Sequence, residues 1–198
     1  MNNPNYFNSK GIILKIQPYS ENDLIVKILT ADYGVISLIA RHARKSKRRF
    51  SNPPDLFERG NFRFRRGHGN LFTLEDFSPH GAFKELRNSL AKVAVASVLC
   101  ECFEQLVKEE AEEPKPLFEL LERALEGIEY AEKTAHTLTV CCSTLSKLLA
   151  LSGFRPAETM PHSNHQSLMK LLNAVESITE RTLKSRDAIC DVALESTA

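Results

Sequence analysis

With 198 residues, 42% of them hydrophobic, and a formal net charge of +1, the chain is long enough to bury a core in one large domain or two small ones. No apolar run approaches the roughly 18 residues that span a bilayer, and the N-terminus has neither a signal-peptide nor a transit-peptide pattern. The five cysteines are an odd number within apolar helical patterns, which favours buried thiols over a disulfide framework. We therefore expect a cytoplasmic protein with no membrane contact.

Three strands are predicted in the first 40 residues, over 11–19, 24–30 and 35–40. In the first, isoleucine and leucine alternate with polar residues, which is the period of a half-buried strand. The second is rich in the β-branched side chains that strands favour. Asp32 and Gly34 supply a tight turn before the third strand, so the three segments form a meander.

The stretch from Arg41 to Arg66 contains ten Lys or Arg and two acids. Up to His80 the chain has 13 basic and 7 acidic residues, a net charge of +6, whereas the remainder has 13 basic and 18 acidic residues, a net charge of −5. A run this dense repels itself, so we interpret it as a surface for a polyanion; the alternative is a solvated loop without a partner. The candidate nucleic-acid-binding residues are Arg41, Arg44, Lys45, Lys47, Arg48, Arg49, Phe50, Arg63, Arg65 and Arg66.

A fourth strand is predicted within 55–66, where Phe62 and Phe64 alternate with two arginines. This period of two sends the rings to the core and the guanidinium groups outward. A glycine-rich turn at 67–70 leads to a fifth strand over 71–77. Five short antiparallel strands without a helical crossover indicate a small closed barrel, an OB-fold first and an SH3-like barrel second.

Three further rings lie at turns or in the basic stretch: Tyr19, Tyr33 and Phe50. Exposed rings of this kind stack on the bases of single strands. The alternative for each is packing in the core.

The period becomes helical from residue 82 onward. Helices are predicted over 82–107, from Pro114 to about residue 128, over 134–152 with Gly153 as its cap, over 168–178 and around 189–194. The first is apolar on nearly all sides and therefore central to a bundle. We thus predict an α+β protein with an OB-fold nucleic-acid-binding domain at 1–79 and an all-α helical domain at 80–198.

Catalytic and metal-binding patterns are weak. No Cys-x-x-Cys occurs, and His162 and His165 are three apart without a third ligand. His42 and His68 have no nearby acid to orient them. We therefore expect no enzymatic activity, no cofactor and no metal.

Several motifs together resemble the bacterial recombination mediator family RecO. They are Ile13-Leu14, Pro18–Asp23, Thr30–Gly34, Ala40–Lys47, Gly153–Pro156 and Leu183–Arg186. The resemblance covers about residues 11–188 and implies an OB-fold followed by a helical domain. Many members carry four zinc-binding cysteines after Gly-Phe-x-Pro. This chain has none there, which makes it similar to a short, zinc-less member.

The resemblance also implies a function in DNA repair and homologous recombination. It implies binding of single- and double-stranded DNA, annealing of complementary strands, and action with RecR to load RecA onto strands coated by single-stranded DNA-binding protein. We expect the basic residues to reduce repulsion between strands and the helical domain to dock the C-terminal tail of the single-stranded DNA-binding protein. A monomer associated with the nucleoid is expected. The alternatives are an RNA- or ribosome-associated OB-fold protein, and a structural adaptor that binds neither nucleic acid.

Overall fold

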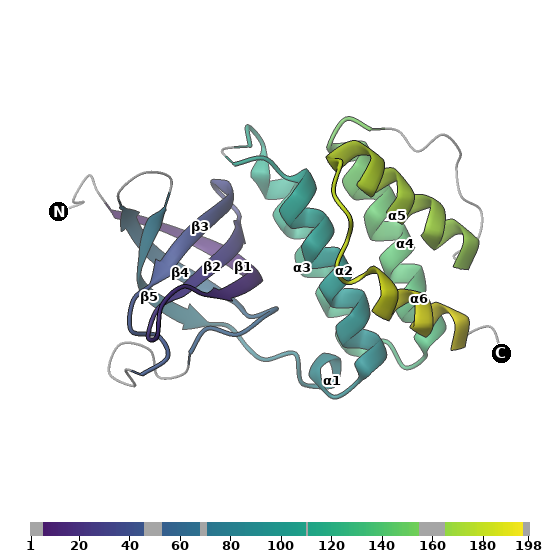
Figure 1. Ribbon diagram of the computed structural model, residues 1–198, viewed down its shortest axis with the longest axis horizontal. Helices are drawn as coiled ribbons and strands as arrows, with labels where there is room; N and C mark the ends of the chain where they lie inside the picture. The colour runs from purple at the N-terminus through teal and green to yellow at the C-terminus, as the bar shows by residue number, and fades with distance from the viewer. Residues whose placement is uncertain (1–5, 46–52, 68–70, 110, 155–164, 196–198) are drawn as a thin grey trace. The chain divides into compact units, whose positions relative to one another are not determined.

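The computed structural model describes residues 6–45, 53–67, 71–109, 111–154 and 165–195 of the chain. Its contacts divide the chain into two compact units (Figure 1). The barrel unit comprises Met1–Ala82 and Lys108–Phe118, and the helical unit comprises Phe83–Val107 and Glu119–Ala198. This differs from the predicted division between residues 79 and 80, because the segment 108–118 belongs with the barrel.

The strands of the barrel unit are β1 (Tyr6–Pro18), β2 (Leu24–Thr30), β3 (Gly34–Ala40), β4 (Arg59–Arg66) and β5 (Phe72–Pro79). They close in the order β1-β2-β3-β5-β4, and β4 pairs with β1. This is an OB-fold barrel, so the predicted fold class is confirmed. The β3–β5 pair is parallel, over Leu38↔Phe72 and Ile39↔Thr73. The prediction that all strands are antiparallel is therefore wrong for this pair.

The first strand is longer than predicted. Its first half, from Tyr6 to Ile12, pairs with β4, and its second half, from Gly11 to Pro18, pairs with β2. A register shift in the β2 pairing, between Ile13 and Lys15, marks a bulge, which bends a strand. The sequence pattern missed the first half because Asn8, Ser9 and Lys10 are three consecutive polar residues, although Ser9 is buried.

Phenylalanines of β4 fill the barrel as predicted. Phe62 and Phe64 are each 1% exposed, whereas Arg63 between them is exposed. The rings belong to a core cluster that also contains Ile13, Val26, Ile28, Leu38 and Leu74. Burying a side chain of this size contributes about 1.5–3 kcal/mol, so the core fixes which face of β4 points to solvent.

A short segment returns to the barrel after the second helix of the chain. Glu109 forms an isolated antiparallel bridge with Gly34 at the start of β3. Gly34 has φ +69°, and a Cβ atom placed on it would lie 2.9 Å from the carbonyl oxygen of Lys108. The close approach of these two backbones therefore requires glycine.

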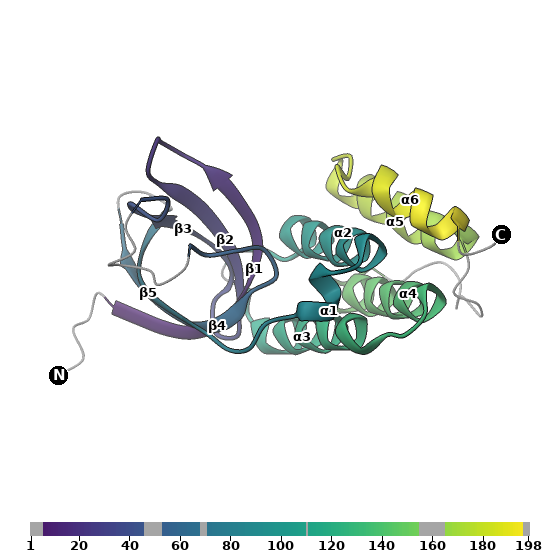
Figure 2. The ribbon, with the colours of Figure 1, turned by 90° about the horizontal axis from the view of Figure 1, so that it is seen from below.

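The helical unit is organised around one helix. Its elements are α1 (Lys84–Arg87), α2 (Leu90–Leu106), the larger part of α3 (Pro114–Tyr130), α4 (Thr134–Leu151), α5 (His165–Thr179) and α6 (Arg186–Glu195). Helix α2 packs against α1, α4, α5 and α6, and its buried residues lie on several sides (Figure 2). The predicted central position is confirmed. No helix among the described residues has the length and hydrophobicity to cross a bilayer.

The predicted helix over 82–107 is divided in two. Ser89 is the N-cap of α2, with extended backbone and a hydroxyl that accepts a hydrogen bond from the N–H of Lys92 at 3.4 Å. Serine satisfies an orphan N–H at a helix start, which favours a new helix here over continuation of α1. The end of α4 agrees with its prediction, since Gly153 has φ +86° and Phe154 N–H donates to the carbonyl of Leu149 at 2.8 Å.

Four of the five cysteines are buried free thiols. Burial raises the pKa of Cys100, Cys102 and Cys141 well above the usual range for a thiol. It raises the pKa of Cys142 to about 11. These thiols therefore remain protonated and unreactive at neutral pH.

The segment Leu183–Arg186 is held by two glutamates. Glu101 accepts the N–H of Lys184 and the N–H of Ser185, each at 2.9 Å, and the hydroxyl of Ser185 at 2.6 Å. Glu176 accepts the N–H of Leu183 at 2.9 Å and forms an ion pair with Arg186. This motif therefore fixes the chain between α5 and α6.

Candidate nucleic-acid interface

The residues after β3 carry exposed cations on a turn with one buried residue. We call the described residues 41–45 the cationic loop. The side chains of Arg41, Arg44 and Lys45 are exposed, whereas Ala43 is 3% exposed and belongs to the barrel core. In the part of the chain that the structure describes, none of these three cations forms an ion pair. Their charge is therefore available to an external anion.

The backbone of the cationic loop is hydrogen-bonded to the loop between β1 and β2. Arg44 N–H donates to the carbonyl of Asn22 at 3.1 Å, and His42 N–H donates to the carboxylate of Asp23 at 2.8 Å. Lys45 N–H closes the turn by donating to the carbonyl of His42 at 3.2 Å. These bonds hold the three cations on an ordered backbone.

The β1–β2 loop presents a tyrosine beside the cationic loop. Tyr19 is 60% exposed, and its backbone N–H donates to the carbonyl of Asp23 at 3.1 Å. Asp23 is the same residue that anchors the cationic loop through its carboxylate. In OB-folds this loop contacts oligonucleotides, so the ring is placed for stacking on a base.

The other candidate ring packs against the core and is partly buried. Tyr33 makes edge-to-face contacts with Phe7, with ring centroids 5.7 Å apart, and with Phe64, 5.8 Å apart. Tyr33 therefore packs against the core cluster, and part of its ring stays accessible. Phe50, with Lys47, Arg48 and Arg49, lies outside the described residues.

Arg63 and Arg65 of β4 face outward, as predicted, but they have neighbours that the sequence pattern did not reveal. The guanidinium carbon of Arg63 lies 5.0 Å from the ring centroid of Tyr6. Arg65 donates to the carboxylate of Glu75 at 2.7 Å, with the two side chains 44% and 24% exposed. Arg66 is exposed and forms no ion pair with any carboxylate that the structure describes. Arg65 is thus the arginine of this set that is least available for phosphate.

Strand pairing brings the two sets of cations into one neighbourhood. Arg65 is opposite Thr73 on β5, and Thr73 is opposite Ile39, two residues before Arg41. One strand therefore separates Arg65 from Ile39, near the end of β3 that leads into the cationic loop, and the spacing of strands makes the distance between these two backbones about 10 Å. Six of the ten predicted binding residues are described, and all six belong to the barrel unit.

The described residues show no metal cluster: nowhere among them do three or more His, Cys, Asp or Glu side chains gather closely enough to hold an ion. His165 is the first residue of α5, and His162 lies outside the described residues.

Comparison with known proteins gives matches over most of the chain. The family described as "Recombination protein O N terminal" matches residues 1–83, and that described as "Recombination protein O C terminal" matches residues 87–183. A DNA repair protein RecO from Syntrophus aciditrophicus is 34% identical over 150 residues, 75% of this chain and 56% of the relative. One from Listeria monocytogenes is 32% identical over 121 residues, 61% of this chain and 46% of the relative. The chain spans about half the length of the curated relatives it matches.

Proposed function

The chain belongs to the recombination protein O family, and on this premise we propose that it acts in DNA repair and homologous recombination. In this proposal it binds single- and double-stranded DNA, anneals complementary strands and helps RecA to load onto strands coated by single-stranded DNA-binding protein. The observation that carries the proposal is the cationic loop, because its three exposed cations project from a backbone that is fixed to the barrel.

Annealing requires charge neutralisation more than chemistry. Two strands approach each other against phosphate repulsion, and Lys or Arg side chains lower it while releasing counterions. Since the loop backbone is ordered before DNA binds, little binding energy is lost in arranging it. A stacked base on Tyr19 would add about 1–3 kcal/mol. No bond is made or broken, so the proposed activity is not enzymatic.

The proposal extends to partners through the family. RecR and the single-stranded DNA-binding protein are the expected ones, and we assign the C-terminal tail of the latter to the helical unit. In this proposal the protein acts on chromosomal DNA as a monomer, in the cytoplasm at the nucleoid.

The test is fluorescence anisotropy of a labelled single strand of about 16 nucleotides over a salt series. If about six phosphates are neutralised, the logarithmic slope of affinity against salt is about −4. The triple variant Arg41→Glu, Arg44→Glu, Lys45→Glu removes three contacts. At about 0.7 per contact its slope becomes shallower by about 2. If the two proteins bind equally at about 1 M salt, the variant therefore binds about 100-fold more weakly than wild type at about 0.1 M salt. Annealing of complementary strands slows in parallel.

A matched control reverses three exposed cations of the helical unit: Lys147→Glu, Arg181→Glu and Lys184→Glu. It changes the net charge equally and is expected to keep the wild-type slope. Unchanged annealing by the loop variant, with circular dichroism of a folded protein, would contradict the proposal. An RNA of matched length that displaces the DNA at lower concentration would favour the RNA-binding alternative.

A further inference from the structure

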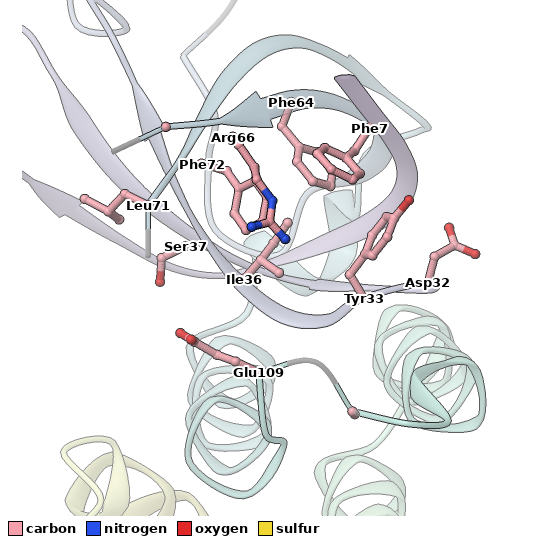
Figure 3. A pocket seen from close by; sticks show the side chains of 12 residues that line it. Phe7, Asp32, Tyr33, Ile36, Ser37, Phe64, Arg66, Leu71, Phe72 and Glu109 are labelled. Atoms are coloured by element: carbon pink, nitrogen blue, oxygen red, sulfur yellow. The ribbon is translucent and has the colours of Figure 1, made fainter. Parts of the chain in front are cut away.

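An aromatic cavity of about 540 Å³ lies at the end of the barrel where the β2–β3 turn is found. All of its lining residues belong to the barrel unit. Four rings line it, Phe7 from β1, Tyr33 from the turn, Phe64 from β4 and Phe72 from β5 (Figure 3). A volume of this size is within the range of small-molecule sites, about 300–1,000 Å³, which occur in the mouths of β-barrels.

The four rings hold one another in place. Phe7 and Phe64 are stacked, with centroids 5.7 Å apart and an interplanar angle of 14°. Phe72 meets both edge-on, with centroids 5.9 Å from Phe7 and 5.3 Å from Phe64. Phe7, Tyr33 and Phe72 are only partly buried, so aromatic surface remains accessible from the cavity. A further flat ring can join such a cluster without reordering it.

The charged groups of the cavity favour a base over a phosphate in its interior. Arg66 provides the cation, and Figure 3 shows its guanidinium among the rings. Asp32, whose carboxylate accepts the hydroxyl of Ser9 at 2.6 Å, and Glu109 also line the cavity. Two carboxylates against one guanidinium repel a polyphosphate chain. A neutral nucleobase is accepted, and the single phosphate attached to its nucleoside meets Arg66.

We propose that this cavity accepts one unpaired nucleobase from a single strand bound to the barrel unit, with the adjoining phosphate held by Arg66. The inference rests on the proposed function, since the cations of the barrel unit bring the strand to it. The cationic loop and the cavity lie at opposite ends of β3, about 20 Å apart along the strand, so the bound strand extends from one to the other. Arg66 follows Arg65 directly on β4, so the cation that lines the cavity is next in the chain to an outward-facing arginine. A base inside a duplex is stacked and paired and must be extruded at a cost before it can enter. Pairing with a complement therefore withdraws the base from the cavity and releases the annealed product.

The experiment compares two labelled strands of equal length on the full-length chain. One has natural bases and the other has abasic sites throughout, so both carry the same phosphates. The measured quantity is the ratio of their affinities at one salt concentration. For wild-type protein the natural strand binds more tightly.

Phe72→Leu is the test variant and Phe77→Leu is its matched control. Both residues are partly buried phenylalanines on β5, but Phe77 stacks on Phe62, with centroids 4.4 Å apart, and does not line the cavity. We expect Phe72→Leu to lower the affinity ratio about tenfold, within the range of base stacking on an aromatic side chain, and Phe77→Leu to leave it unchanged. Ser37→Phe, which introduces a ring on a lining residue, lowers the ratio without deleting a core side chain.

The outcomes separate this inference from the proposed function. If Phe72→Leu and Ser37→Phe keep the wild-type ratio, the cavity takes no base, while salt-dependent binding of the abasic strand leaves the proposed function standing. If the abasic strand shows no salt-dependent binding at all, the proposed function is itself wrong.

Discussion

Replacing Gly34 by alanine tests how closely the segment 108–111 is packed on the barrel. Gly34 begins β3 with φ +69°, and an added Cβ would lie 2.9 Å from the carbonyl oxygen of Lys108 and 3.1 Å from the amide nitrogen of Ala111. Both neighbours are backbone atoms, which cannot move aside as a flexible side chain can. The substitution therefore combines backbone strain with displacement of the segment.

The two effects have separate magnitudes. A left-handed conformation costs a non-glycine residue about 1–2 kcal/mol. Displacement of the segment breaks the bridge between Gly34 and Glu109, and a backbone hydrogen bond contributes about 0.5–1.5 kcal/mol. We expect Gly34→Ala to lower the free energy of unfolding by about 2–3 kcal/mol. Gly81→Ala is the matched control, because Gly81 has φ +71° and nothing within 4 Å of its added Cβ, so it has the strain alone.

Urea unfolding followed by circular dichroism measures both variants, since the chain has no tryptophan to report by fluorescence. Hydrogen exchange of the amides at 109 and 111 then locates the change. Gly34→Ala should accelerate their exchange and Gly81→Ala should not. Equal losses of stability in the two variants, with unchanged exchange at 109 and 111, would refute the packing of this segment on β3.

Three other predictions concern charge, anchoring and pH. Arg44→Ala should make the salt slope of single-strand binding shallower by about 0.7. Arg65→Ala should change the slope by less, because Glu75 already pairs with Arg65 at 2.7 Å. Equal changes in the two variants would contradict this difference between Arg44 and Arg65. Glu101→Ala leaves three donors of Lys184 and Ser185 without their acceptor. It should therefore lower the free energy of unfolding by about 2–4 kcal/mol and accelerate amide exchange at 184 and 185. The control Glu132→Ala, at an exposed site, should do neither. Burial raises the pKa of Cys100 and Cys102 in the folded protein, so these thiols ionise first in the unfolded state. Stability should therefore be retained below about pH 8.5 and fall above it, by about 1.4 kcal/mol per pH unit for each such thiol; urea unfolding of the double variant Cys100→Ala, Cys102→Ala should show a shallower decline.

The barrel was predictable where one residue pattern decides the structure. In β4 the alternation of Phe62 and Phe64 with arginines leaves only one face that can be buried, and the structure has those rings in the core. Gly153 likewise predicts the end of α4, since few other residues adopt its backbone angle at low cost.

Features that depend on distant residues were not predictable in this way. The polar start of β1 becomes a strand because β4 pairs with it, and Glu75 pairs with Arg65 from the neighbouring strand. The return of Glu109 to Gly34 brings together residues 75 positions apart. Periodicity describes the neighbours of a residue along the chain, whereas these contacts are set by the closed barrel.

The short β3–β5 ladder makes one seam of the barrel weaker than the others. Only Leu38↔Phe72 and Ile39↔Thr73 join these strands, whereas β4 pairs with β5 and β2 pairs with β3 along most of their lengths. When this seam opens, the other ladders stay intact and the strands form a curled sheet in the order β3-β2-β1-β4-β5. Because few backbone hydrogen bonds are lost, this opening has the lowest free-energy cost among partial openings of the barrel. Because Phe72 stands at the seam, the same local fluctuation widens the entrance through which a flat group would pass.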